Sequence, residues 1–135
     1  MAVIVVVALA ACASEPAPNT TLHTEANSAL VAKFYGPSIG GVELLDLIVG
    51  KRFVRQGPRI GMGDSFCTDG QYKRVGHRAV STGRYIVEDD RYCVASGATK
   101  TCAWVFPAGE GKFMLVHEPH LSSTEVVTIA SNAAC

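Results

Sequence analysis

Turn signals recur about every ten residues from Lys51 to the C-terminus, and this regularity constrains the fold more than any other feature of the chain. Runs rich in β-branched and aromatic residues, such as GRYIV, RYCVA, TCAWVF and TEVVTIA, alternate with polar or glycine-containing segments such as TDGQ, VEDDR, SGATK and PAGEG. Runs of this kind favour strands, and Asp-Gly pairs between them favour tight hairpins. The pattern therefore predicts a mainly β protein built as an antiparallel up-and-down meander.

Seven to eight strands are expected, at about 51–56, 63–68, 71–76, 79–87, 91–96, 100–106, 112–117 and 124–130. A meander of that length either closes into a small barrel or curls around a short helix. The segment GGVELLDLIVGK supplies such a helix, over about 41–49, because Val42, Leu45 and Ile48 share one helical face. For SALVAKFYG, over 28–36, a short helix and an irregular strand are both open.

The first residues form an apolar run that ends at a cysteine, MAVIVVVALAAC. An α-helix over Ala2–Ala11 would reach only about half of the hydrocarbon thickness of a bilayer, so a permanent transmembrane helix is not expected. A buried N-terminal strand and an ordinary secretion signal are alternatives. The small residues that close the run favour a signal peptide with its cleavage site.

Leu9-Ala10-Ala11-Cys12 resembles the lipobox of bacterial lipoprotein signal peptides. The resemblance implies cleavage before Cys12, acylation of this residue with fatty acids such as palmitate, and membrane attachment through several acyl chains. Ala13 after the cysteine implies sorting to the outer membrane, with the protein facing the periplasm. We therefore expect a signal peptide at 1–11, a flexible Pro- and Thr-rich tether at 12–27, and a single β-rich domain at 28–135.

The cysteine count agrees with this interpretation. Five cysteines leave four if Cys12 carries lipid, and four can form two disulfides in an oxidising compartment. With a turn centred between Gly97 and Ala98, Cys93 and Cys102 lie opposite each other across one hairpin, where a disulfide is possible. Cys67 and Cys135 would then form a second bridge that ties the C-terminus to an early strand.

Charge balance and motif spacing argue against a nucleic-acid partner, a nucleophilic enzyme and a calcium-binding loop. Twelve Lys and Arg residues balance twelve Asp and Glu residues, and all of them follow Cys12, so no excess of basic residues points to nucleic acid. Ser65 and Ser81 lie in no nucleophile motif, and the acidic turn Glu88–Asp90 lacks the spacing of a calcium loop. We expect no cofactor and no catalytic activity.

The segment HEPH offers the one candidate metal site, with His117 and His120 as ligands of a metal-binding protein or enzyme. Pro119 between them prevents the helical spacing that would align both imidazoles, so a polar turn between two strands is the favoured interpretation. The aromatic residues of the predicted strands belong to the core or line a concave ligand face; the sequence leaves both open.

The block SFCTDGQYKRVGHRAVSTGRYIVEDDRYCV is similar to small exported β domains of proteobacteria. FCTDG and STGRY, with the terminal cysteine, weakly resemble the small-barrel lipoprotein inhibitors of lysozyme. We expect a lipid-anchored envelope protein that acts without catalysis, as a binding or envelope-support module. Its partners would be the membrane, through the N-terminal lipid, and a protein or small molecule; inhibition of a lytic enzyme such as lysozyme is the alternative.

Overall fold

The structure, a computed structural model, describes residues 20–56, 62–76 and 78–135, with side chains from Ala26 onward. The expected signal peptide at 1–11 and the expected lipid attachment site at Cys12 lie outside the described residues.

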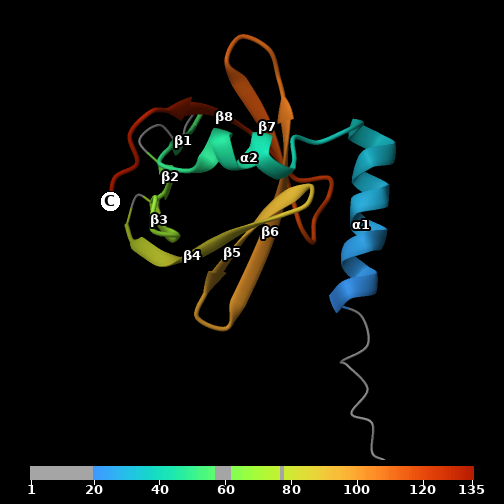
Figure 1. Ribbon diagram of the computed structural model, residues 1–135, viewed down its shortest axis with the longest axis horizontal. Helices are drawn as coiled ribbons and strands as arrows, with labels where there is room; N and C mark the ends of the chain where they lie inside the picture. Colours follow the sequence, from blue (N-terminus) through green and yellow to red (C-terminus); the bar gives the residue numbers. More distant parts are fainter. Residues whose placement is uncertain (1–19, 57–61, 77) are drawn as a thin grey trace, which may run out of the picture.

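Two helices and eight strands make up the described part of the chain (Figure 1). They are α1 (Thr20–Tyr35), α2 (Gly41–Ile48), β1 (Arg52–Arg55), β2 (Gly63–Phe66), β3 (Gln71–Val75), β4 (Val80–Glu88), β5 (Arg91–Ser96), β6 (Thr99–Pro107), β7 (Lys112–His117) and β8 (Thr124–Ala130). Each strand pairs antiparallel with the next, and β8 pairs with β1 to close the barrel. The predicted mainly β meander is confirmed, and of the two arrangements left open the closed barrel is the one observed.

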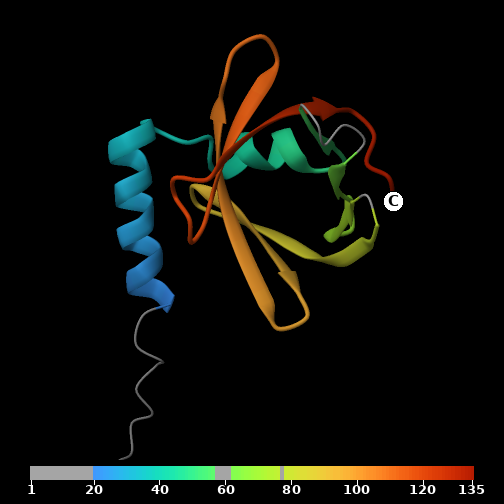
Figure 2. The same cartoon turned by 180° about the vertical axis from the view of Figure 1, so that it is seen from behind.

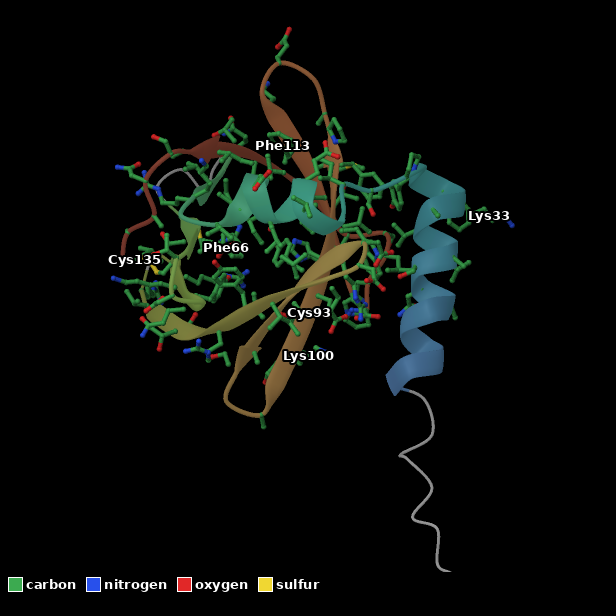
Figure 3. The ribbon with its side chains drawn as sticks, in the orientation of Figure 1. Lys33, Phe66, Cys93, Lys100, Phe113 and Cys135 are labelled. Atoms are coloured by element: carbon green, nitrogen blue, oxygen red, sulfur yellow. A yellow bond between two sulfur atoms is a disulfide. The ribbon has the colours of Figure 1, made fainter. Side chains whose placement is uncertain are left out.

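Phe66 is at the centre of the barrel's apolar interior. Its ring centroid lies 4.9 Å from that of Phe53, 5.2 Å from those of Tyr85 and Tyr92, and 5.5 Å from that of Tyr72. Figure 3 shows Phe66 beneath α2. Most of these contacts are edge-on or tilted, as aromatic quadrupoles prefer.

Helix α2 closes one end of the barrel and confirms the helix predicted over 41–49, but its buried face differs from the predicted one, because Val42 is 73 % exposed and Leu45 is 41 % exposed. Leu44 and Ile48 are fully buried in the same apolar cluster as Phe66. The amide of Gly41 donates to the carbonyl of Asp89 over 2.8 Å, and that of Gly50 donates to Phe66 over 2.7 Å. These bonds tie α2 to the β4–β5 turn and to the end of β2. The interior is therefore covered at this end, and any opening must lie at the opposite one.

Helix α1 begins at Thr20, within the segment expected to be a flexible tether, and settles the ambiguity over 28–36 in favour of a helix. It lies beside the barrel in both views (Figures 1 and 2). Val31 packs with Trp104, Phe106 and Val116, which point outward from β6 and β7. The tether prediction was wrong for 20–27 because this helix is stabilised by packing on the barrel, which the composition of the segment does not reveal.

In the described part of the chain, neither helix combines the length and apolar character needed to cross a membrane.

Two disulfides brace the barrel in the pairing expected from the sequence. Cys93 on β5 and Cys102 on β6 are bonded across one hairpin, in direct register, with their Cα atoms 4.0 Å apart. Cys67, just after β2, is bonded to Cys135, and the amide of Ala134 donates to the hydroxyl of Ser65 over 2.9 Å. The C-terminal residues are thus fixed against the outside of β2.

Candidate functional site

The barrel interior is divided along its axis into an apolar half and a charged half. On five strands the inward position nearer α2 is apolar or aromatic, and the inward position two residues away is polar or charged, because alternate residues of a strand share one face. The pairs are Phe53 and Arg55 on β1, Phe66 and Asp64 on β2, Tyr72 and Arg74 on β3, Leu115 and His117 on β7, and Val127 and Glu125 on β8. Charged side chains therefore converge at the end that α2 does not cover.

Asp64 is the centre of this charged half. Its carboxylate is buried and accepts hydrogen bonds from the Tyr72 hydroxyl at 2.7 Å, from Nε of Arg74 at 2.7 Å and from Nη2 of Arg55 at 3.3 Å. Burial and the charge of Asp64 raise the pKa of Tyr72, so its hydroxyl keeps the proton that it donates. The buried carboxylate is thus compensated by two cations and one neutral donor.

Glu125 extends the network to the other side of the barrel. Its Oε2 accepts from Nε of Arg55 at 2.8 Å, and its Oε1 lies 2.8 Å from Nε2 of His117. Burial opposes ionisation, but the bonds from His117 and Arg55 outweigh it and lower the pKa of Glu125 to about 2. An ionised carboxylate only accepts hydrogen bonds, so His117 carries its proton on Nε2.

A pocket of about 570 Å³ opens above this network. Its lining comes from β1, β3, β6, β7, β8 and the β7–β8 turn, namely Arg55, Gln56, Arg74, Thr101, His117, Glu118, Ser123, Thr124, Glu125 and Val126. The volume suits a small molecule. The charged pairs thus form the floor and walls of a pocket that is polar and preorganised.

Helix α1 holds the turn that forms one wall of the pocket. Asn27 donates to Oε1 of Glu118 over 2.6 Å, and the Tyr35 hydroxyl donates to the carbonyl of Leu121 over 2.7 Å. Arg91 donates to the other oxygen of Glu118 at 3.0 Å, so both carboxylate oxygens are occupied. Helix α1, which the sequence left open only over 28–36, therefore contributes to the position of the site.

The acidic turn after β4 has a structural role in the barrel. Glu88 pairs with Arg91 and Lys100, and Oδ2 of Asp90 accepts from the indole of Trp104 over 3.0 Å. Arg91 lies over the Trp104 ring at 5.3 Å from its centroid, a cation–π contact. The side chains and carbonyls of Glu88–Asp90 thus hold neighbouring elements together, as the bonds from Gly41 to Asp89 and from Ser38 to Asp90 also show.

The two candidate metal ligands occupy different surroundings. His117 lines the pocket and is engaged with Glu125, whereas His120 is exposed in the turn that follows. Within residues 26–56, 62–76 and 78–135, the one group of three or more potential ligands close enough to share a metal ion is Glu88, Cys93 and Cys102, and it contains neither histidine. The two cysteines are joined as a disulfide, which removes the thiolates that a metal would need.

The sequence indicated His117 only as a candidate metal ligand. It did not single out the four charged residues Arg55, Asp64, Arg74 and Glu125. A signal for them is present, because each lies two residues from an apolar or aromatic residue within a predicted strand. A charge at a core-facing position of a strand is unusual unless it is paired or functional. The missing information was which face of each strand turns inward, and closure of the barrel supplies it.

Comparison with protein-family models, with curated proteins and with solved structures finds no match to this chain.

Proposed function

We propose that this protein is a lipid-anchored module of the bacterial cell envelope that binds a small polar ligand at the open end of its barrel, without catalysis. The observation that carries the proposal is the pocket of about 570 Å³ lined by the Arg55, Arg74, His117 and Glu125 side chains. Glu125 pairs with Arg55 and His117, and Asp64 pairs with Arg74, so these groups are fixed before any ligand arrives. Preorganised polar groups of this kind give affinity because little order is lost on binding.

Binding rather than catalysis is favoured by the state of the carboxylates. A general base works best when its pKa is near the operating pH, and Glu125 has a pKa of about 2 with both oxygens engaged. Asp64 is buried, and its two carboxylate oxygens already accept from Arg55, Arg74 and Tyr72, so neither oxygen is open to a substrate proton. These groups are suited to holding a ligand through fixed charge and hydrogen bonds.

The envelope location is supported by the disulfides and by the lipobox-like sequence. Two disulfides braced across a small barrel are typical of an oxidising compartment, and Leu9-Ala10-Ala11-Cys12 supplies a candidate acylation site. Outer-membrane sorting, with the domain facing the periplasm, remains our proposal for the mature protein.

Acylation is tested by feeding cells an alkyne-tagged palmitate and comparing the wild-type chain with Cys12→Ala. We expect label on the wild-type protein, recovered in the membrane fraction, and none on the variant. Label on both chains would contradict the anchoring proposal.

Ligand binding is tested by NMR titration of the Cys12→Ala chain with a panel of neutral and acidic mono- and disaccharides. We expect the amide signals of Thr101, Thr124 and Glu125 to shift, while those of Leu44 and Ile48 at the covered end stay in place. The binding proposal would be contradicted if no saccharide of the panel shifted an amide signal of a pocket residue, or if only signals outside the pocket shifted.

A further inference from the structure

The hydrogen-bonding groups of the pocket are unequally used. The acceptors are occupied: Glu125 and Glu118 each have a partner on both carboxylate oxygens, and Asp64 accepts from three side chains. A ligand that offers only donors would therefore have to compete with bonds that already exist.

The donors are not all occupied. Arg55 uses Nε and Nη2, and Arg74 uses Nε and Nη2; among the described residues no partner accepts from Nη1 of either arginine. Both arginines line the pocket, and the Arg74 side chain is 43 % exposed there. The bonds to Asp64 fix the orientation of both guanidinium groups. They leave the Nη1 amino group of each arginine available to donate to a ligand.

The remaining lining is rich in hydroxyl groups. Thr101, Ser123 and Thr124 stand on the pocket wall, where each hydroxyl can donate or accept. Glu125 and Glu118 carry negative charge beside the arginines, so the pocket disfavours a polyanion, and an anionic group would bind where Nη1 of Arg55 and Nη1 of Arg74 can donate to it. The rest of the ligand would be uncharged and rich in hydroxyls.

We propose that the pocket binds a small, hydroxyl-rich ligand with a single anionic group, an acidic monosaccharide or a sugar phosphate, whose carboxylate or phosphate oxygens accept from Nη1 of Arg55 and Arg74. This inference rests on the proposed function as a binding module and adds the class of ligand. A carboxylate and a phosphate offer the same acceptor oxygens, so the experiment includes both.

The test is isothermal titration calorimetry of the Cys12→Ala chain with three matched sugars: glucuronate, glucose 6-phosphate and glucose. We expect at least one anionic sugar to bind about tenfold or more tightly than glucose, since charged hydrogen bonds carry the difference. Added NaCl should weaken binding of the anion and leave that of glucose unchanged. Preference for the carboxylate over the phosphate, or the reverse, identifies which anionic group the pocket accepts.

Arg74→Gln is the diagnostic variant, and Lys73→Gln is its control. Both remove one positive charge from β3, but the adjacent positions of a strand face opposite sides, so Lys73 points out of the barrel. Arg74→Gln should weaken binding of the anion about tenfold or more, and Lys73→Gln should change it less than about twofold. Should Arg74→Gln fail to fold, Arg74→Lys retains the charge without the guanidinium fork and should still weaken binding.

The outcomes separate this inference from the proposed function. If glucose and the anionic sugars bind equally at the pocket, without dependence on salt, the ligand class is wrong and the binding module stands. If Lys73→Gln weakens binding as much as Arg74→Gln, a general attraction of charge replaces the specific contact and the inference is overturned. If none of the sugars binds, the inference is overturned. The NMR titration described under the proposed function then tests separately whether the protein is a binding module.

Discussion

The charged half of the barrel depends most on Asp64. A buried carboxylate without partners would be costly, and this one is stabilised by Arg55, Arg74 and Tyr72. The dependence is mutual, because Arg55 is itself buried and relies on Asp64 and Glu125 for compensation. At the scale of single residues, the network behaves as a unit, and removal of one member leaves an uncompensated charge.

Asp64→Asn should lower the free energy of unfolding by about 3–5 kcal/mol, because the variant leaves the buried Arg55 without one of its two anions. Urea denaturation followed by Trp104 fluorescence measures the change. The matched control is Asp46→Asn on the exposed face of α2, which should change the free energy by less than about 0.5 kcal/mol. Equal effects of the two substitutions would show that the network contributes little.

Glu125 makes stability dependent on pH in the acid range. Its pKa falls from an ordinary value of 4.5 to about 2 on folding, so its contribution is complete above pH 4.5 and is lost as the pH falls towards 2. Unfolding free energies measured at steps between pH 6 and pH 2 should fall over this window, and those of Glu125→Gln should fall less steeply. Parallel pH profiles for the two proteins would contradict the assignment.

At the scale of elements, five of the eight strands contribute to both halves of the barrel interior. The inward residue near α2 builds an apolar core around Phe66, and the next inward residue on five strands adds a charge or a polar group to the open end. The covered end is therefore suited to stability and the open end to binding. A one-residue slip in the register of any strand would exchange its inner and outer faces and disrupt both halves.

The two disulfides should contribute to the free energy of unfolding to different extents. Cys67–Cys135 closes a loop with a sequence separation of 68 residues, and Cys93–Cys102 one of 9 residues. Chain entropy then predicts that the Cys67→Ala/Cys135→Ala variant loses about 4 kcal/mol of unfolding free energy and the Cys93→Ala/Cys102→Ala variant about 3 kcal/mol. Thermal and urea unfolding of the two double variants provide the comparison. A larger loss for the hairpin pair would indicate that local packing at β5–β6 outweighs the entropy of the long loop.

At the scale of the whole molecule, α1 joins the barrel wall to the pocket. Its Val31 is buried against Trp104, Phe106 and Val116 outside the barrel, and its Asn27 reaches the pocket residue Glu118. Figure 3 shows Lys33 on the opposite side, pointing away from the barrel. A helix held by one apolar contact surface and by hydrogen bonds from Asn27 and Tyr35 should separate from the barrel before the barrel unfolds.

Val31→Ala should weaken this attachment by about 2 kcal/mol, because two buried methyl groups are lost. Hydrogen exchange should then become faster for the amides of α1 and for the β7–β8 turn that α1 holds, while the amides around Phe66 keep their protection. Phe34→Ala is the control: its side chain is on the same helix and is 72 % exposed, so exchange should be little changed. Faster exchange throughout the barrel would show that α1 and the barrel unfold together.

Much of the architecture could be predicted from the chain alone. Local turn chemistry and the alternation of side chains along a strand act over short distances. They predict the eight strands and the pairing of Cys93 with Cys102, and local helical periodicity predicts α2. The sequence left a helix over 28–36 open but determined neither the choice of helix over strand nor its extension to Thr20, because Val31 packs on strands more than seventy residues later in the chain. The Cys67–Cys135 bridge was reached by elimination, since no local rule brings those residues together.

The sequence by itself determined the class of the fold, the register of the hairpin that places Cys93 opposite Cys102, and the cysteines that could be paired. Only the tertiary structure decided that the sheet closes, that α2 covers one end, and that Arg55, Asp64, Arg74 and Glu125 meet at the other. The physical reason is the distance along the chain over which each interaction acts. Turn propensity and strand alternation are properties of neighbouring residues, whereas a charged pocket inside a barrel exists only after β8 has paired with β1 and fixed which face of every strand points inward.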